Sequence, residues 1–322
     1  MRKLIEFLLP FADIVLAPFI YPAGLMFKLI RKAGLDRLVL CRRLLLHIGI
    51  IPIRNHYYEP RIDYRNLKPI FFKDRNLAGV NWNVEDQLNL LKQFIFSNEL
   101  KDIPLQKQKD KTFYFNNGAF ESGDAEYWYQ LIRSIKPKRI IEIGSGHSTL
   151  MAIKAINKNR ENDPMYECDH VCIEPFEMPW LEKMSVSVIR KKVEDVELSY
   201  FSKLQNNDIL FIDSSHIIKP EGDVLFEFLE LLPSLSSGVI VHIHDIFSPK
   251  NYWKKCIQEK IYFWNEQYLL EAFLTNNNQW KILGALNFLH HNYFDKLKIV
   301  APYLTFDRDP GSFYIQKTMV AP

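Results

Sequence analysis

The sequence is poor in cysteine, and its charges almost cancel. Its four cysteines, Cys41, Cys168, Cys172 and Cys256, are scattered over 322 residues, which excludes the disulfide framework of a small secreted domain and favours a reducing compartment. The formal net charge of +3 is too small to indicate a nucleic-acid partner, and no basic run interleaved with aromatic residues occurs. There is also no internal repeat and no low-complexity tract, so a repeat architecture is not predicted.

Cys168, His170 and Cys172 lie close together and have the residue types of half a zinc site. No second pair follows at the spacing of a zinc finger. We therefore expect these residues to lead into a buried strand rather than to bind a metal.

The N-terminal segment differs in composition from the rest of the chain. Residues 1–50 carry a formal charge of +5, whereas the remaining 272 residues sum to −2. The stretch from Phe7 to Phe27 is apolar except for Asp13, and its length matches a bilayer span of about 20 residues. However, Pro10, Pro18 and Pro22 are expected to interrupt a helix here, since proline in a helix interior costs about 3 kcal/mol or more. No A-x-A site follows, which argues against a cleaved signal peptide.

Three interpretations of this segment stay open: contact with a membrane surface, helices packed on the main domain, and a true membrane span. We predict three parts of the chain: a basic, apolar, helical segment (residues 1–56), a partly helical connecting region (57–123) with an amphipathic stretch at Val84–Phe96, and the main domain (124–322). Membrane contact through residues 1–50 would place the protein in the cytoplasm, at the inner face of the cytoplasmic membrane.

From residue 124 onward, short apolar runs alternate with stretches at helical spacing. Asp124 is expected to cap the first helix, with Glu126 in its first turn. The apolar runs are Arg139–Ile143, Val171–Ile173, Ile209–Ile212 and Val239–Ile243, and the helical stretches between them include Ser148–Asn157 and Val224–Leu235. This alternation predicts an α/β fold: a doubly wound, mostly parallel, Rossmann-like sheet covered on both faces, preceded by a helical extension.

The strand Arg139–Ile143 leads directly into the glycine turn Gly144–Gly146. Glycines allow a tight turn and close approach of a ligand, and the helix that starts at about Ser148 offers free N–H groups. In dinucleotide enzymes such a turn holds a pyrophosphate. Here Thr149 replaces the third glycine and Glu142 would repel a phosphate, whereas Glu142 could pair with the ammonium group of a cofactor that carries an amino acid. A purely structural turn is the other interpretation.

A second carboxylate, Glu174, ends the strand Val171–Ile173. In doubly wound folds an acid at this position accepts hydrogen bonds from ribose hydroxyls. Its separation from the glycine turn exceeds the usual spacing of about 20 residues, because the polar stretch Asn157–Asp163 is expected to form a loop. A surface glutamate that precedes Pro175 is the alternative.

Polar side chains follow the next two apolar runs. Asp213 and His216 come after Ile209–Ile212, and Asp245 ends the other run with His244, while His242 lies two residues earlier on the same face as His244. Ligands of open α/β sheets bind outside the carboxyl ends of the strands. If the two strands are neighbours, about 4.8 Å apart, Asp213 and Asp245 would share a cation or a substrate hydroxyl. A neutral histidine near pH 7 accepts a proton from a hydroxyl, and His216 is the first candidate for this base and His244 the second.

Together, EIGSG, the IEP strand end, LFIDSSH, LPSLSSGVIVHIHDIF and FWNEQYLLEAFL resemble a bacterial family of class I S-adenosylmethionine-dependent methyltransferases. The family is related to the O-methyltransferases of macrolide and aminocoumarin sugars, and the resemblance covers the chain from about Tyr57 to its end. It implies S-adenosylmethionine as the cofactor. It also implies that Asp213 and Asp245 are ligands of a divalent cation such as Mg²⁺. The sequence departs from the family at His244, in place of a second Asp, and at Ser215, in place of the catalytic acid, so the metal and the base stay open.

The expected function is O-methylation of a sugar hydroxyl in a surface polysaccharide or glycolipid. The alternatives are a nicotinamide-dependent oxidoreductase and a non-catalytic, membrane-associated protein that binds the cofactor. The expected partner is a glycan or glycolipid acceptor, without nucleic acid. The candidate site residues are Glu142, Gly144, Ser145, Gly146, Ser148, Glu174 and Asp213 for the cofactor; His216, His244 and Asp245 for catalysis; and Asp213 and Asp245 for a metal.

Overall fold

The computed structural model describes residues 2–60, 63, 66–108 and 111–318. The end of the predicted main domain, residues 319–322, lies outside this range. The chain divides into two compact units, Met1–Leu67 and Lys68–Pro322. The predicted connecting region is therefore divided as well, since residues 68–123 belong to the same unit as the sheet.

The first unit contains a long helix, α1 (Arg2–Ala33), and a short one, α2 (Val39–Ile48). Pro10, Pro18 and Pro22 all lie inside α1, so the expected interruption does not occur. Each proline removes one N–H donor but fixes a φ angle that a helix accepts, and the other backbone bonds of this 32-residue helix keep it continuous. The stretch Ile5–Ala33 has the length and apolar composition of a membrane span, with a mean hydropathy of 1.6.

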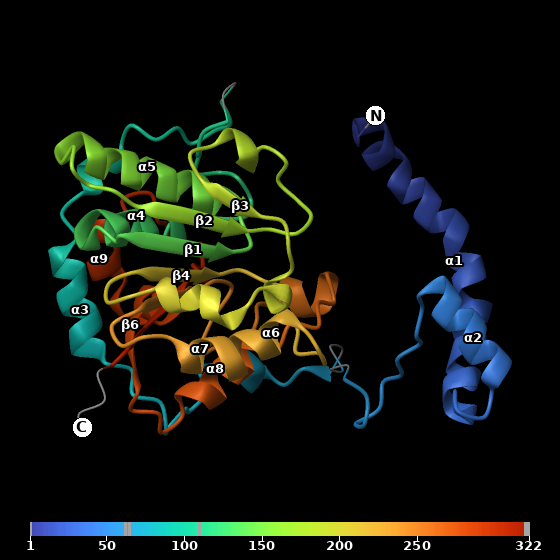
Figure 1. Ribbon diagram of the computed structural model, residues 1–322. Coiled ribbons are helices and arrows are strands. Elements are labelled where there is room, and N and C mark those ends of the chain that lie inside the picture. Colours follow the sequence, from blue (N-terminus) through green and yellow to red (C-terminus); the bar gives the residue numbers. More distant parts are fainter. Residues whose placement is uncertain (1, 61–62, 64–65, 109–110, 319–322) are drawn as a thin grey trace. The chain divides into compact units, whose positions relative to one another are not determined.

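The second unit is built on a seven-stranded sheet in the order β3-β2-β1-β4-β5-β7-β6 (Figure 1). Only β7 runs antiparallel to its neighbours β5 and β6. The strands are β1 (Arg139–Ile143), β2 (Asp169–Ile173), β3 (Ser187–Ile189), β4 (Ile209–Ile212), β5 (Ile240–Ile243), β6 (Trp280–Ala285) and β7 (Phe313–Lys317). All four predicted apolar runs are strands, and the predicted fold class is confirmed.

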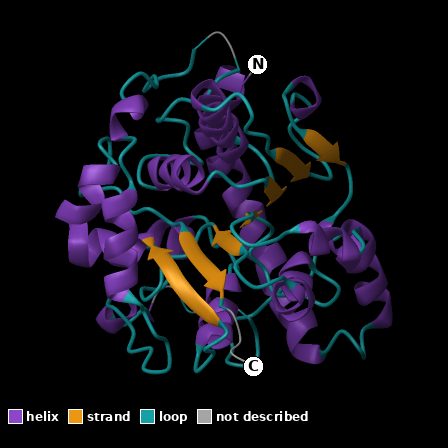
Figure 2. Ribbon diagram, turned by 60° about the vertical axis from the view of Figure 1, so that its left-hand side comes forward, coloured by secondary structure: helices purple, strands orange, loops and turns teal. Residues whose placement is uncertain are grey.

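Helices cover both faces of the sheet (Figures 1 and 2). One face packs against α4 (Asp124–Ile135), α5 (His147–Asn162) and α9 (Leu286–Val300), with α3 (Val84–Gln93) against β6 and α9. The other face packs against α6 (Asp223–Phe226), a π-helical turn (Glu227–Leu231), α7 (Leu232–Ser234) and α8 (Glu266–Leu274). Short 3₁₀ or π segments lie at Pro69–Phe72, Ser97–Leu100, Leu181–Lys183, Val193–Asp195, Leu198–Lys203 and Lys255–Glu259.

Two local expectations are wrong. The stretch Asn157–Asp163, expected as a loop, continues α5 as far as Asn162. Its polarity reflects the solvent-facing end of a helix rather than a loop, which a helix tolerates because only one of its faces must be buried. Asp124 is the first residue of α4 and does not cap it; instead, Glu126 accepts a hydrogen bond from the backbone N–H of Gly123. The carboxylate of Asp124 is thereby left for contacts elsewhere.

Candidate active site

The glycine turn after β1 lies against the end of β4. Gly144 has a φ of 77°, and a Cβ atom at this position would overlap the backbone carbonyl of Asp213. Only glycine meets both conditions without strain. A cavity of about 780 Å³ opens beside the turn and is lined by Gly144, Ser145, Glu174 and Asp213, among others. It follows the carboxyl ends of β1, β2 and β4, where an open α/β sheet binds its ligand.

Glu142 does not line this cavity, contrary to the expected contact with a cofactor ammonium. Its side chain is fully buried beneath the turn. One carboxylate oxygen accepts hydrogen bonds from Ser148 Oγ and Thr149 Oγ1 at 3.0 and 2.8 Å, and the other lies 2.5 Å from His170 Nε2. Ser148, also expected to contact the cofactor, thus points down to Glu142. Both residues hold the start of α5 in place and so support the turn from below.

Glu174 lies where the sequence analysis placed it, at the end of β2 and on the wall of the cavity. Its carboxylate accepts backbone hydrogen bonds from Ser145, Phe176 and Glu177. These contacts fix the orientation of the carboxylate and leave acceptor capacity for further donors, since an ionised carboxylate has about four lone-pair sites. The geometry is suitable for the predicted ribose contact.

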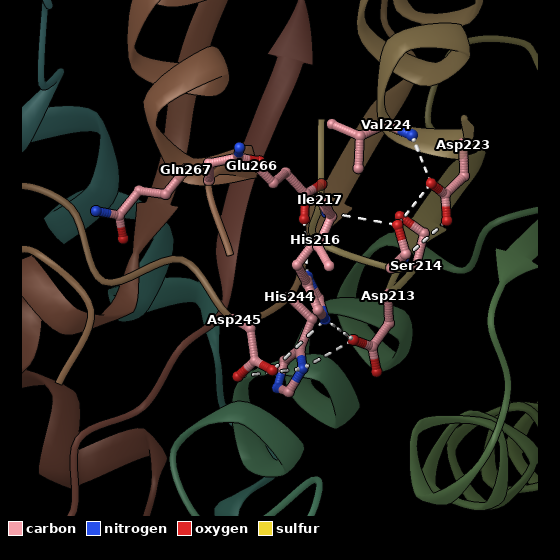
Figure 3. A network of polar contacts seen from close by, with 12 residues as sticks. Asp213, Ser214, His216, Ile217, Asp223, Val224, His244, Asp245, Glu266 and Gln267 are labelled. Carbon is pink, nitrogen blue, oxygen red and sulfur yellow. Dashed lines mark hydrogen bonds and ion pairs between the residues drawn. The ribbon is translucent and has the colours of Figure 1, made fainter. Parts of the chain in front are cut away.

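Asp213, His216, His244 and Asp245 come together at the ends of β4 and β5, which are neighbouring parallel strands as expected (Figure 3). We call these four residues the acid–histidine cluster. His216 Nε2 lies 3.3 Å from Asp213 Oδ1 and 3.7 Å from Asp245 Oδ2. His244 Nδ1 lies 3.5 Å from Asp213 Oδ1 and 3.9 Å from Asp245 Oδ1.

Two further carboxylates adjoin the cluster, and the sequence analysis assigned neither to the site. Glu266, at the start of α8, is fully buried and bonds His216 Nδ1 at 2.8 Å. Asp124 accepts hydrogen bonds from the backbone of Gly311 and Ser312 and lies 3.8 Å from His244 Nε2. Glu266 lies within FWNEQYLLEAFL, one of the segments that carry the family resemblance. Its contact with His216 could not be predicted, because the two residues are 50 positions apart in the sequence.

The acid–histidine cluster holds opposite charges close together, with both histidines buried and both aspartates partly exposed. Burial disfavours the charged form of both histidines, but Asp213 beside them, with Glu266 for His216 and Asp245 for His244, raises the pKa of each well above its usual value. Burial alone would raise the pKa of Asp213, yet His244 and His216 hold it well below its usual range. Burial raises the pKa of Asp245. In the ligand-free protein the two histidines therefore serve as the cations that balance the carboxylates.

The backbone at this edge is also unusual. His216 and Asp245 have φ angles of 60° and 56°, in the left-handed region that non-glycine residues seldom adopt. Such conformations cost about 1–3 kcal/mol each and concentrate at functional sites. Both ring nitrogens of His244 are buried and have no hydrogen-bond partner within the described part of the chain, which marks a place where a bound group would supply one.

The donor set fits a divalent cation. One ligand atom each from Asp213, His216 and Asp245 lie within 4.8 Å of one another. Two carboxylates and an imidazole suit Mg²⁺, Mn²⁺ or Zn²⁺. The sequence analysis named the two aspartates, and the structure adds His216 as a third candidate ligand.

A second cavity, of about 510 Å³, opens on the other side of the cluster. Asp213 lines both cavities, while His244 and Asp245 line only the second. Four aromatic residues, Phe247, Trp253, Tyr262 and Trp264, lie along its wall. The cavity thus combines flat apolar faces with several carboxylates, among them Asp124, Asp213 and Asp245.

Residues 141–246 match a protein family described as a methyltransferase domain. An uncharacterised protein of Archaeoglobus fulgidus is 31% identical over 175 residues, which cover 50% of this chain and 77% of that relative. The range that matches the family, residues 141–246, contains the glycine turn, Glu174 and the whole acid–histidine cluster.

Solved structures similar to this chain include two methyltransferases. The plantazolicin methyltransferase in complex with SAH is 14% identical, with coverage of 62% of this chain and 83% of that one and a TM-score of 0.32. A putative protein-L-isoaspartate O-methyltransferase of Plasmodium falciparum, in complex with S-adenosyl-L-homocysteine, is 15% identical, with coverage of 56% and 81% and a TM-score of 0.27. TM-scores this low do not establish a common fold. The assignment of the fold depends instead on the sheet order and the family match.

Proposed function

Since the chain belongs to the class I S-adenosylmethionine-dependent methyltransferases, we propose that it O-methylates a sugar hydroxyl of a glycolipid or polysaccharide at a membrane. One observation carries this proposal: the cavity beside the glycine turn and the aromatic cavity meet at Asp213. A methyl donor in the first and an acceptor in the second would face each other across the acid–histidine cluster.

The aromatic cavity favours a sugar as the acceptor. Aromatic rings offer flat apolar faces to the C–H face of a sugar ring, while carboxylates accept hydrogen bonds from its hydroxyls. Trp264 stands 4.9 Å from Tyr262 and 5.7 Å from Trp253 between ring centroids, so the three form one continuous wall. A few polar groups at the base of an apolar wall are typical of a small-molecule site.

The cluster supplies a base for the acceptor hydroxyl. Glu266 holds His216 through Nδ1, so His216 Nε2 faces Asp213 and Asp245. Without a metal, only the neutral form of His216 can accept a proton; because Asp213 and Glu266 raise its pKa, this form becomes more populated as the pH rises. His216 Nε2 would then take the hydroxyl proton as the oxygen is methylated.

Asp213, Asp245 and His216 would hold a divalent cation, which when bound polarises a hydroxyl oxygen and orients it. In that case His216 is occupied as a ligand, and His244, with its two unpartnered ring nitrogens, is the remaining base. The metal-dependent scheme, with His244 as the base, and the metal-free scheme, with His216 as the base, can therefore be distinguished by removal of the metal.

We further propose that the first unit contacts a membrane. Several large apolar residues of α1 and α2 are at least 67% exposed to solvent: Phe7, Phe11, Ile14, Phe19, Leu29 and Leu40. Exposed apolar surface of this extent marks an interaction site, and the accompanying +5 charge attracts anionic lipid headgroups. The catalytic unit would then act on acceptors at the cytoplasmic face.

The test is methyl transfer from labelled S-adenosylmethionine to fractions of a bacterial cell envelope, with purified full-length protein. Label in a glycolipid or polysaccharide fraction is the expected result. EDTA should abolish transfer and Mg²⁺ or Mn²⁺ restore it under the metal scheme, without loss of S-adenosylhomocysteine binding. For variants in which Asp213 or Asp245 is changed to Asn, Asp169→Asn is the matched control, because Asp169 lies at an exposed position and pairs with Arg139. Cofactor binding without transfer to any fraction would instead support the non-catalytic alternative.

The nicotinamide alternative has little support. Thr149, in place of the third glycine, accepts a hydrogen bond from the backbone of Gly146 and donates one to Glu142. The Thr149 side chain therefore occupies the space under the turn. In dinucleotide-binding folds a third glycine stands here and allows the helix to pack closely on the strand. Calorimetry with NAD and S-adenosylmethionine separates the two; tight binding of NAD alone would reverse the assignment.

A further inference from the structure

The first unit contains a groove that neither the catalytic site nor the apolar surface of α1 explains. It has a volume of about 640 Å³ and lies between α1 and the segment that returns along it. Its lining is Gly24, Phe27, Lys28, Pro52, Ile53, Arg54, Asn55 and His56. Gly24 lines the groove, and nothing lies within 4 Å of the place where its Cβ would be, so a larger side chain has room here.

The lining contains Lys28, Arg54 and His56, and none of the lining residues is acidic. The nearby carboxylate is Glu59, which Arg31 engages through two hydrogen bonds of 3.0 and 2.8 Å. Arg54 reaches Glu59 only at 3.5 Å. Because Arg31 already neutralises Glu59, the positive charges of Lys28 and Arg54 in the groove are left for an external anion.

His56 adds a neutral donor to this set. Its Nδ1 accepts a hydrogen bond from the backbone N–H of Tyr58 at 3.3 Å. When Nδ1 accepts, the proton of a neutral imidazole sits on Nε2. His56 therefore offers a donor in addition to the ammonium of Lys28 and the guanidinium of Arg54, and three donors around one space suit the oxygens of a phosphate.

The groove lies where the apolar run of α1 ends. Residues from Phe7 to Phe27 are apolar except for Asp13, and Lys28 follows directly. Side chains at such a boundary meet the headgroup layer when the apolar run enters a membrane. An anion held here would have its hydrocarbon tail alongside α1, which matches a lipid better than a soluble phosphate.

We propose that this groove binds the phosphate headgroup of an anionic lipid, with Lys28, Arg54 and His56 as its donors. The inference depends on the proposed membrane contact and adds a defined site to it. A generic basic surface attracts all anionic lipids alike, by about five-fold per basic residue. A built groove instead prefers an exposed phosphate monoester over other headgroups of equal charge.

The test is flotation of the full-length protein with vesicles of phosphatidylcholine that contain either phosphatidic acid or phosphatidylserine, matched in surface potential. At least ten-fold tighter binding to phosphatidic acid is expected. Lys28→Gln with Arg54→Gln should remove this preference while binding to both kinds of vesicle continues. Arg37→Gln with Arg43→Gln makes the same change of charge at exposed positions outside the groove and should keep the preference.

Gly24→Phe tests the groove without any change of charge, because the added ring would occupy the open space. It should remove the preference as well. Equal binding of the wild-type protein to both vesicles, or the same loss in the Arg37/Arg43 control pair, would overturn the groove while membrane contact stands. Absence of binding to every vesicle would overturn both. Submillimolar glycerol phosphate that abolishes the preference would assign the groove to a soluble phosphate.

Discussion

Two groups of carboxylates and histidines lie in the unit that contains the sheet, yet their surroundings differ. In the first, Glu142 and His170 are buried beneath the glycine turn, and Ser148 and Thr149 complete the bonds of the carboxylate. In the second, the histidines lie 3.3–3.9 Å from Asp213 and Asp245. Among the described residues, neither ring nitrogen of His244 has a hydrogen-bond partner, whereas His170 lacks one only at Nδ1. The same residue types therefore form a nearly complete hydrogen-bond set in one place and a set open to a further group in the other, which is where we propose the chemistry takes place.

Substitutions in the acid–histidine cluster should therefore mainly reduce activity, whereas substitutions at Glu142 should mainly reduce stability. The largest effect is expected from Asp213→Asn with Asp245→Asn, which removes the charge of the acid–histidine cluster. Methyl transfer should fall by about 10³-fold or more, because preorganised charge at a reacting centre contributes about 10²–10³-fold per group. The free energy of unfolding should also fall, because His216 and His244 lose the carboxylates that raise their pKa, but by less than after a change at buried Glu142, since the side chains of Asp213 and Asp245 are 37% and 23% exposed. Initial rates and urea denaturation measure the two quantities; full activity in the double variant would move the active site elsewhere.

Glu142→Ala should show the reverse pattern. The substitution leaves His170, Ser148 and Thr149 without their shared acceptor, and each buried polar group left unsatisfied costs about 1–3 kcal/mol. Urea denaturation should reveal this loss. Glu142→Gln retains the shape and an acceptor oxygen, so it should lose much less. A stable Glu142→Ala protein that no longer binds S-adenosylhomocysteine would show that Glu142 acts on the cofactor after all.

Glu174→Ala changes a residue on the cavity wall and should act mainly on cofactor affinity. Hydrogen bonds to a charged acceptor contribute about 1.5–3 kcal/mol, so the Kd for S-adenosylhomocysteine should rise by about 10–150-fold. Calorimetry measures this. Glu182→Ala is the neighbouring control, because its side chain lies outside the cavity and pairs with Arg190. An equal loss in both variants would assign the effect to the loop rather than to a ribose contact.

The sequence predicted those features that depend on local pattern. Apolar runs of three to five residues identified four of the strands. The ends of β4 and β5 placed Asp213 beside Asp245, because neighbouring parallel strands end at the same edge. Contacts between distant segments were beyond its reach. Glu266 meets His216 across 50 residues, and no periodicity encodes that distance. The direction of the Glu142 side chain was equally hidden, since a residue that precedes a glycine turn can face either the ligand or the helix below it.

Ser148 provides the smallest and most discriminating test of the comparison. Its hydroxyl donates to Glu142 Oε2 at 3.0 Å, and Thr149 donates to the same oxygen at 2.8 Å. Ser148→Ala therefore removes one of two donors and leaves the acceptor satisfied, so the free energy of unfolding should fall by only about 0.5–1.5 kcal/mol. The Kd for S-adenosylhomocysteine should stay unchanged, because the hydroxyl points away from the cavity. Thr149→Val is the matched variant, and it should lose more stability because Thr149 Oγ1 also accepts the N–H of Gly146. A ten-fold weaker cofactor affinity in Ser148→Ala at unchanged stability would place this hydroxyl among the ligand contacts and remove the contrast between the two groups.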